Sequence, residues 1–223
     1  MKIDVLTLFP EAYAALNTGI IGRALEKKLF EVDIHNIRDY SQDKHKKCDD
    51  YPYGGGAGMV MTPQPVYDAI HSIDPEHKAI RIYLSPRGRL LNQQKVLKLS
   101  GYDNILLLSG SYEGIDQRAI DLTVDEEISV GDYILTSGDI PALILINAVA
   151  RYIPGVLGSG DSVISESFND GLLEYPQYTR PYEFMGLTVP EVLISGNHKL
   201  IEEWRTAEQL KATKFRRPDL LEK

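Results

Sequence analysis

Strand-like and helix-like hydrophobic patterns alternate along the first two thirds of this chain, and no other sequence feature constrains its fold as strongly. Residues 105–108 are apolar throughout, as expected of a strand that is buried on both faces of a parallel sheet. The whole pattern predicts an α/β domain with a mostly parallel sheet. Strands are expected at residues 2–8, 32–37, 80–84, 105–108 and 128–130, and helices at 11–28, 63–73, 92–99, 116–122 and 141–152.

The alternation ends after Tyr152. Residues 153–181 are rich in Gly, Ser, Asp and Pro without a sustained period, whereas 198–210 place Leu200, Ile201, Trp204 and Leu210 at helical spacing. We therefore expect a large domain at 1–157, a flexible linker at 158–170 and a small helical C-terminal domain at 171–223. The linker is expected to be poorly ordered without a ligand.

Several classes of protein and site are excluded by simple features of the sequence. No apolar run reaches the roughly 18 residues that a membrane helix needs, and the N-terminus lacks the pattern of a signal peptide. The single cysteine, Cys48, excludes an intrachain disulfide and fits a reducing cytosol. The five histidines show no paired spacing, so we expect no protein metal site. A cytoplasmic protein without a membrane segment is predicted.

The charge of the chain leaves nucleic-acid binding open. A formal net charge of −8 opposes it, because neutralising phosphates requires Lys and Arg. Basic residues nevertheless gather in two places, which are either solvated surface or a phosphate-binding patch. They are Lys44, His45, Lys46 and Lys47 in one cluster and Lys199, Arg205, Lys211, Lys214, Arg216 and Arg217 in the other.

Four segments near strand ends are rich in Gly, Pro and polar residues: 83–88, 109–114, 129–133 and 136–141. In open α/β sheets, ligands bind where such loops converge at the carboxyl ends of the strands. Glycine allows close approach of a ligand to the main chain. The four loops together predict a pocket that is built largely from backbone.

The usual nucleotide and hydrolase motifs are missing. There is no GxxxxGK[ST] sequence and no GxSxG elbow. The run Gly54-Gly55-Gly56-Ala57-Gly58 lacks the GxGxxG spacing and follows a polar loop, so a Rossmann dinucleotide site and a dinucleotide-dependent oxidoreductase are not supported. The run is either a tight structural turn or a loop that lets a ligand approach the backbone.

Several longer sequence words carry a specific resemblance. Pro52-Tyr53-Gly54-Gly55-Gly56-Ala57-Gly58-Met59, Tyr112-Glu113-Gly114-Ile115-Asp116, Val130-Gly131-Asp132-Tyr133, Tyr178-Thr179-Arg180-Pro181 and Ser195-Gly196-Asn197-His198 resemble the bacterial tRNA guanine-N1 methyltransferases. The similarity runs in register from Leu8 to Pro218. It implies a SPOUT fold, with helices on both faces of the sheet and a C-terminal trefoil knot in the catalytic domain.

The resemblance also implies the reaction and the partners. Members of this family are homodimers whose active sites are shared between chains. They use S-adenosylmethionine to methylate N1 of the guanosine on the 3′ side of the tRNA anticodon. The domain at 1–157 would then be catalytic, and the domain at 171–223 would bind tRNA.

Residue by residue, the similarity assigns the methyl donor to the loops singled out above. Asp132 has a structural alternative, in which its carboxylate caps a turn. The donor-binding residues implied by the resemblance are Tyr83, Leu84, Ser85, Pro86, Gly110, Tyr112, Glu113, Val130, Gly131, Asp132, Tyr133, Ile134, Leu135, Gly138 and Pro141.

The resemblance assigns three catalytic residues. Guanine N1 must lose its proton, and negative charge then builds on O6, which needs a positive or donor group. Arg151 resembles the family's catalytic arginine, although a C-terminal arginine can also complement a helix dipole. Glu166 stands where most relatives have an aspartate as the base. The glutamate side chain keeps the carboxylate but is one methylene longer than aspartate. Glu113 is the second acidic candidate. In the family this residue is linked to dependence on Mg²⁺, so the resemblance makes Mg²⁺ a possible cofactor.

Two further positions depart from the family pattern. Ser111 stands where relatives often have Arg, and Ser137 where they often have Gly. The rival functions are a related SPOUT enzyme acting at another RNA position and a catalytically impaired RNA-binding relative. The matching segments in the linker and the C-terminal domain argue against the related enzyme. The retained Arg151, Tyr112 and Glu113 argue against the impaired relative.

Overall fold

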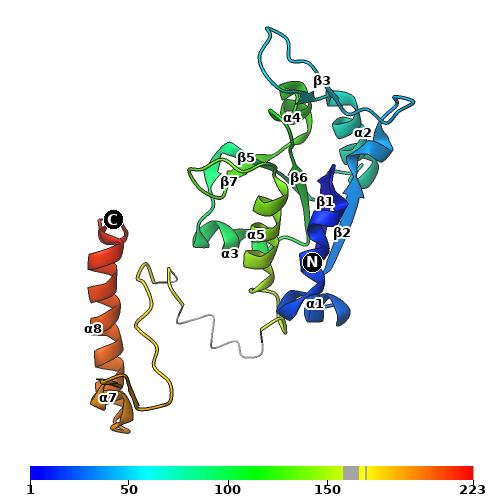
Figure 1. The fold of residues 1–223 in the computed structure, drawn as a ribbon. Coiled ribbons are helices and arrows are strands. Elements are labelled where there is room, and N and C mark those ends of the chain that lie inside the picture. The colour runs from blue at the N-terminus through cyan, green and yellow to red at the C-terminus, as the bar shows by residue number, and fades with distance from the viewer. Residues whose placement is uncertain (158–165, 169, 223) are drawn as a thin grey trace. The chain divides into compact units, whose positions relative to one another are not determined.

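A computed structural model describes residues 1–157, 166–168 and 170–222 of the chain (Figure 1). The chain divides into two compact units, Met1–Gly158 and Ser159–Lys223. The linker predicted at 158–170, with its predicted mobility, lies for the most part outside the described residues. No helix among the described residues is long and apolar enough to cross a membrane.

The first unit is built on a five-stranded sheet in the order β2-β1-β6-β5-β7. Every neighbouring pair of strands is parallel, which confirms the predicted α/β class. The chain supplies them as β1 (Lys2–Thr7), β2 (Glu31–Asn36), β5 (Ile80–Leu90), β6 (Asn104–Ser109) and β7 (Glu126–Ser129).

Helices cover both faces of this sheet. The central strand β6 sends Ile105 and Leu107 to one face and Leu106 and Leu108 to the other, and all four side chains are buried. The first face carries η1 (Pro10–Asn17), α1 (Gly19–Glu26), α3 (Gln93–Ser100) and α5 (Asp139–Ala150). The second carries η2 (Ile37–Tyr40), α2 (Pro63–Ile73) and α4 (Gln117–Thr123).

Two α-helices of the first unit, α3 and α4, begin at a capping side chain. Asn92 accepts a hydrogen bond from the amide of Lys95 at 2.9 Å, which confirms its predicted role as the cap of α3. Asp116 accepts from the amide of Arg118 at 3.0 Å and caps α4 in the same way. These caps fix where each helix leaves the strand-end loop before it.

The single helix predicted at 11–28 is wrong. The segment forms the 3₁₀ helix η1 and then α1, because Thr18 is extended and Gly19 has a φ of +63°. The two pieces cross closely: a Cβ at Gly22 would lie 2.5 Å from the backbone of Asn17. The helical spacing of apolar residues continues through the turn, so the sequence pattern predicts one helix where the structure has two.

The strand predicted at 80–84 is also too short. β5 runs on to Leu90, with a register shift against β7 between Leu84 and Arg89. Gly88 permits this return, because a Cβ there would lie 2.4 Å from the backbone nitrogen of Ile128. The bulge carries Ser85 and Pro86 out of the sheet at the predicted pocket.

The polar stretch before α2 contains a small antiparallel ladder of β3 (Asp49–Asp50) and β4 (Val60–Met61). Met61 also forms a parallel bridge with Ile115, in the loop after β6. The glycine-rich run at 54–58 therefore lies in a loop whose far end is tied to the main domain.

The second unit contains β8 (Glu183–Phe184), β9 (Leu187–Thr188), α7 (Glu191–Ile194), α8 (His198–Arg216) and η3 (Pro218–Leu221). The helix predicted at 198–210 is present and continues to Arg216. Trp204 packs against the rings of Tyr175 and Tyr178, and the Arg205 guanidinium lies 4.9 Å from the Tyr175 ring centre. Thr213 is the one fully buried side chain among this unit's described residues.

Candidate active site

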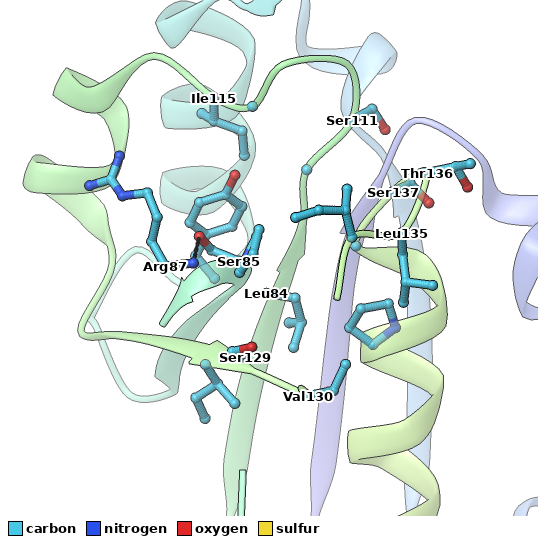
Figure 2. Close-up of a pocket in the computed structure, with 18 of the residues that line it drawn as sticks. Leu84, Ser85, Arg87, Ser111, Ile115, Ser129, Val130, Leu135, Thr136 and Ser137 are labelled. Atoms are coloured by element: carbon cyan, nitrogen blue, oxygen red, sulfur yellow. Dashed lines mark hydrogen bonds between the residues drawn. The ribbon is translucent and has the colours of Figure 1, made fainter. Parts of the chain in front are cut away.

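A cavity of about 320 Å³ lies at the carboxyl ends of β5, β6 and β7. Figure 2 shows Ser85 and Arg87 on one side of it and Leu135 and Ser137 on the opposite side. Parallel sheets bind ligands at this edge, and volumes of about 300–1,000 Å³ are usual for small-molecule sites. The cavity is lined by residues 83–87, 110–115, 128–131, 133–138, Ile120 and Pro141.

The structure brings together the predicted donor-binding residues with one exception. Tyr83, Leu84, Ser85, Pro86, Gly110, Tyr112, Glu113, Val130, Gly131, Tyr133, Ile134, Leu135, Gly138 and Pro141 all line the cavity. Asp132 is exposed and does not line it. The Tyr133 ring folds back against Gly131, where a Cβ would lie 2.3 Å from Tyr133 Cε1, and Asp132 is left facing solvent.

Two glycines bring the loops after β6 and β7 into direct backbone contact. The amide of Gly138 donates to the carbonyl oxygen of Gly110 at 2.8 Å. A Cβ at Gly138 would lie 2.9 Å from the nitrogen of Gly110, and a Cβ at Gly110 would lie 2.8 Å from the Tyr83 hydroxyl. Side chains at either position would therefore fill the space between the loops.

Tyr83 lines the cavity and is 7% exposed. Burial raises the pKa of its phenol, and the nearby Glu127 carboxylate raises it further, whereas Arg87 opposes the shift. The phenol therefore stays protonated at neutral pH and can donate a hydrogen bond to a ligand.

The Tyr112–Gly114 wall is held by β4. The amide of Glu113 donates to the Met59 carbonyl at 3.0 Å, and the amide of Met61 donates to the Gly114 carbonyl at 2.9 Å. Tyr112 adopts a φ of +59°, which is uncommon for a residue with a side chain. The residues that directly follow the glycine-rich run thus hold this wall in place.

Comparison with known proteins shows to which family the chain belongs. The profile of the tRNA (guanine-1)-methyltransferase TrmD family matches residues 1–223. The chain belongs to this family. It is 55% identical to the tRNA (guanine-N(1)-)-methyltransferase of Clostridioides difficile (strain 630), over 100% of this chain and 98% of that protein. Enzymes of the same name from Ruminiclostridium cellulolyticum and Clostridium botulinum (strain Alaska E43 / Type E3) are 54% and 53% identical, over 97% and 92% of their lengths.

Two of the predicted catalytic residues of this tRNA (guanine-1)-methyltransferase family member lie outside the cavity lining. Arg151 is half-buried and caps the C-terminus of α5 in the first unit. Glu166 is half-buried and belongs to the second unit. Glu113 alone among the three lines the cavity. The catalytic roles of all three stay predictions.

The two departures from the family pattern have definite positions. Ser111 lines the cavity at 5% exposure, and its hydroxyl has no hydrogen-bond partner among the described residues. Ser137 also lines it, and its hydroxyl donates to Asp139 at 2.7 Å. An unpartnered buried hydroxyl in a cavity wall is a natural partner for a polar ligand atom.

Several lining residues are absent from the donor-binding residues that the resemblance implies. Arg87, Ser129, Thr136 and Ser137 lie within the four loops that were predicted to form the pocket, although the resemblance did not assign them to the donor. Ile115 stands next to the predicted segment 109–114, whereas Ile120 lies within α4 and outside all four loops, so no loop signal indicated it.

Asp4, Asp33 and His35 form a group of metal-ligand type on β1 and β2. The ammonium of Lys2 lies 3.0 Å from Asp4 and 3.1 Å from Asp33, so a protein cation already pairs with both carboxylates. We therefore assign this group to the stability of the sheet edge.

Proposed function

We propose that this chain transfers a methyl group from S-adenosylmethionine to N1 of the guanosine on the 3′ side of the anticodon in tRNA. The observation that carries the proposal is the backbone-walled cavity, which contains fourteen of the residues assigned to the methyl donor. The full-length match to the family supports the same conclusion.

The residues present fit an adenosyl ligand. Gly110, Gly131 and Gly138 keep main chain at the cavity surface, where a Cβ would collide with a neighbour. The protonated Tyr83 phenol and the Ser111 hydroxyl offer polar contacts. When bound, S-adenosylmethionine supplies an electrophilic methyl group to a nitrogen nucleophile.

The protein must make guanine N1 nucleophilic. In our proposal Glu166 accepts the N1 proton, and Arg151 stabilises the negative charge that builds on O6. Glu113 lies in the cavity wall and holds the amino-acid end of the donor. A contribution of Mg²⁺ through Glu113 belongs to this proposal, since the carboxylate is the type of ligand that Mg²⁺ prefers.

We include a trefoil knot in the proposed fold. After β7, at one edge of the sheet, the chain returns through residues 130–138 to place α5 against β1 and β6 in its middle. Gly138 meets Ser109 and Gly110 on that path. This course supports a C-terminal segment threaded past the loop after β6.

The proposed assembly is a homodimer with shared active sites. α5 is apolar over almost its whole length, and Ile140 and Ile144 on its outer side are 50% and 41% exposed. An exposed apolar helix beside the cavity is a suitable face for a second copy. Sedimentation should show a dimer for the wild type and a shift toward monomer for Ile144→Asp.

The second unit is proposed to hold the anticodon arm, in the cytoplasm where tRNA is found. Its described residues bury little, and it exposes aromatic and basic side chains that can stack on bases and pair with phosphates. The cluster of Tyr175, Tyr178 and Trp204 with Arg205 supports this role.

The test is the identity of the product. Purified protein is incubated with labelled S-adenosylmethionine and tRNA transcripts that carry either guanosine or adenosine at the target position, and the methylated nucleotide is located by nuclease digestion and mass spectrometry. We expect N1-methylguanosine at that position alone. A methyl group at another nucleotide would assign the chain to another RNA site, and tRNA binding without transfer would make it an RNA-binding relative.

A further inference from the structure

A buried carboxylate that does not line the cavity lies directly behind its wall. Asp139, the first residue of α5, is 3% exposed. It accepts hydrogen bonds from three hydroxyl groups: Thr7 at 2.6 Å, Tyr13 at 3.1 Å and Ser137 at 2.7 Å. No ion pair to Asp139 exists within the described part of the chain. Its charge is therefore balanced by hydroxyl dipoles and by the N-terminus of α5.

The partners come from elements far apart in sequence. Thr7 ends β1, Tyr13 lies in η1, and the Tyr13 hydroxyl also lies 2.8 Å from the hydroxyl of Ser109 at the end of β6. Burial raises the pKa of Tyr13, and Asp139 raises it further against the opposing Ser109, so the phenol remains protonated. One carboxylate thus joins β1, β6, η1 and the start of α5.

This network reaches the cavity through two residues. Ser137 and Gly138 precede Asp139 and line the cavity, whereas Thr7, Tyr13, Ser109 and Asp139 do not. The Ser137 hydroxyl is held by Asp139, and the Gly138 amide is held by the Gly110 carbonyl at 2.8 Å. The position of this wall therefore depends on where Asp139 is fixed.

A buried carboxylate of this kind lowers the stability of the fold unless its hydrogen bonds compensate for the lost hydration. Burying a carboxylate is unfavourable without full compensation, and an apolar residue in the same place often packs with equal or greater stability. Buried polar groups can instead define one arrangement of the elements around them. Here the elements so defined are the ends of β1 and β6, η1 and the loop at Ser137 that lines the cavity.

We propose that Asp139 is a positioning residue that sets the affinity of the cavity for its nucleoside ligand. Held by Thr7 and Tyr13, it fixes Ser137 and Gly138 against Gly110 without contacting the ligand. This inference rests on the proposed function, in which the cavity binds S-adenosylmethionine. It extends that function to residues behind the wall.

The experiment compares Thr7→Val, which removes the hydroxyl with little change of shape, with Thr7→Ser, which keeps it. Because the Thr7 oxygen also accepts from the Phe9 amide, Tyr13→Phe is the independent variant. Binding of S-adenosylmethionine and S-adenosylhomocysteine is measured by calorimetry, and kcat and KM by methyl transfer to tRNA. Thermal unfolding shows that each full-length variant is folded.

We expect Thr7→Val and Tyr13→Phe to raise the Kd of both ligands and the KM of the donor by about tenfold, the effect of losing one charge-assisted hydrogen bond. The kcat at saturating donor and the KM for tRNA should stay near wild type, and Thr7→Ser should bind normally. A purely structural role would lower the active fraction, and with it kcat, at unchanged KM. That result, or wild-type affinity in both variants, would overturn the inference.

Gly110→Ala separates this inference from the proposed function. Its Cβ would lie 2.8 Å from the Tyr83 hydroxyl and 2.9 Å from Tyr83 Cε2, so it obstructs the cavity itself. If Gly110→Ala abolishes donor binding while Thr7→Val and Tyr13→Phe bind normally, the positioning role alone fails. If Gly110→Ala binds normally, the donor lies elsewhere and both proposals fail.

Discussion

The Glu113 side chain lies directly against Gly58: a Cβ at Gly58 would come within 2.5 Å of Glu113 Oε1. The glycine-rich loop therefore approaches the one predicted catalytic carboxylate that lines the cavity. The sequence of this loop is compatible with either a tight turn or a ligand-binding loop. In the structure Gly58, at the end of this loop, lies against the Glu113 side chain, and the absence of a Cβ there leaves room for that side chain.

Gly58→Ala should lower methyl transfer by displacing the Glu113 carboxylate. Gly54→Ala is a matched control, because Gly54 has a similar φ of +87° against +82° but no atom within 4 Å of its Cβ position. The two variants share the backbone strain of a left-handed alanine, about 1 kcal/mol. In steady-state kinetics kcat/KM should fall about tenfold or more for Gly58→Ala alone. Equal losses in both variants would show that loop strain, and not Glu113, is responsible.

The buried ion pair of Arg81 and Asp74 should be important for stability. Arg81 is 3% exposed, and its Nε lies 2.8 Å from Asp74 Oδ2. Arg81→Met leaves Asp74 buried without its cation, which typically costs about 3–5 kcal/mol. Urea denaturation should show this loss as a lower midpoint. Arg118→Met, which breaks an exposed pair with Asp116, should change the midpoint little. Similar midpoints for the two variants would contradict the assignment.

Acid should destabilise the first unit partly through Asp4. Burial alone would raise the pKa of Asp4, but hydrogen bonds from His35 at 2.7 Å and Lys2 hold it below its ordinary value of 3.8. A carboxyl group whose folded pKa is lowered stabilises the protein above its unfolded pKa, and this contribution is lost as the pH falls through the folded value.

Asp4→Asn should therefore be less stable than wild type at about pH 6, and the difference should shrink below about pH 4. Urea midpoints measured across this range test it. Asp33→Asn, which removes the exposed partner of the same Lys2, should preserve the wild-type pH dependence. A constant gap between Asp4→Asn and wild type at every pH would rule out the titration of Asp4 as the cause.

Patterns of local sequence predicted the sheet, most helices and the four cavity loops, because each depends on hydrophobic period or on turn residues. Two features were not predicted: the break between η1 and α1 at Thr18 and Gly19, and the continuation of β5 to Leu90. Both depend on close backbone contacts, of Gly22 with Asn17 and of Gly88 with Ile128. The hydrogen bond between Thr7 and Asp139 spans 132 positions, and no local pattern indicates such a partner.

The same limit applies to the catalytic residues. Resemblance located Arg151 and Glu166, but under the proposed function their action depends on tRNA and on a second copy, neither of which a local sequence pattern specifies. Asp132 shows the opposite case, in which a residue inside a matching sequence word faces solvent. A matching sequence segment therefore predicts where a loop lies more reliably than it predicts which side chains of that loop face the cavity.

The most direct test of the proposed mechanism is single-turnover methyl transfer to a tRNA transcript with the target guanosine, for wild type, Glu166→Gln and Glu166→Asp. We predict that Glu166→Gln loses about 100- to 10,000-fold in rate, the usual contribution of a general base, while it binds S-adenosylmethionine normally. Glu166→Asp, which keeps the carboxylate, should retain transfer. Transfer by Glu166→Gln at the wild-type rate would contradict the account and place the base elsewhere.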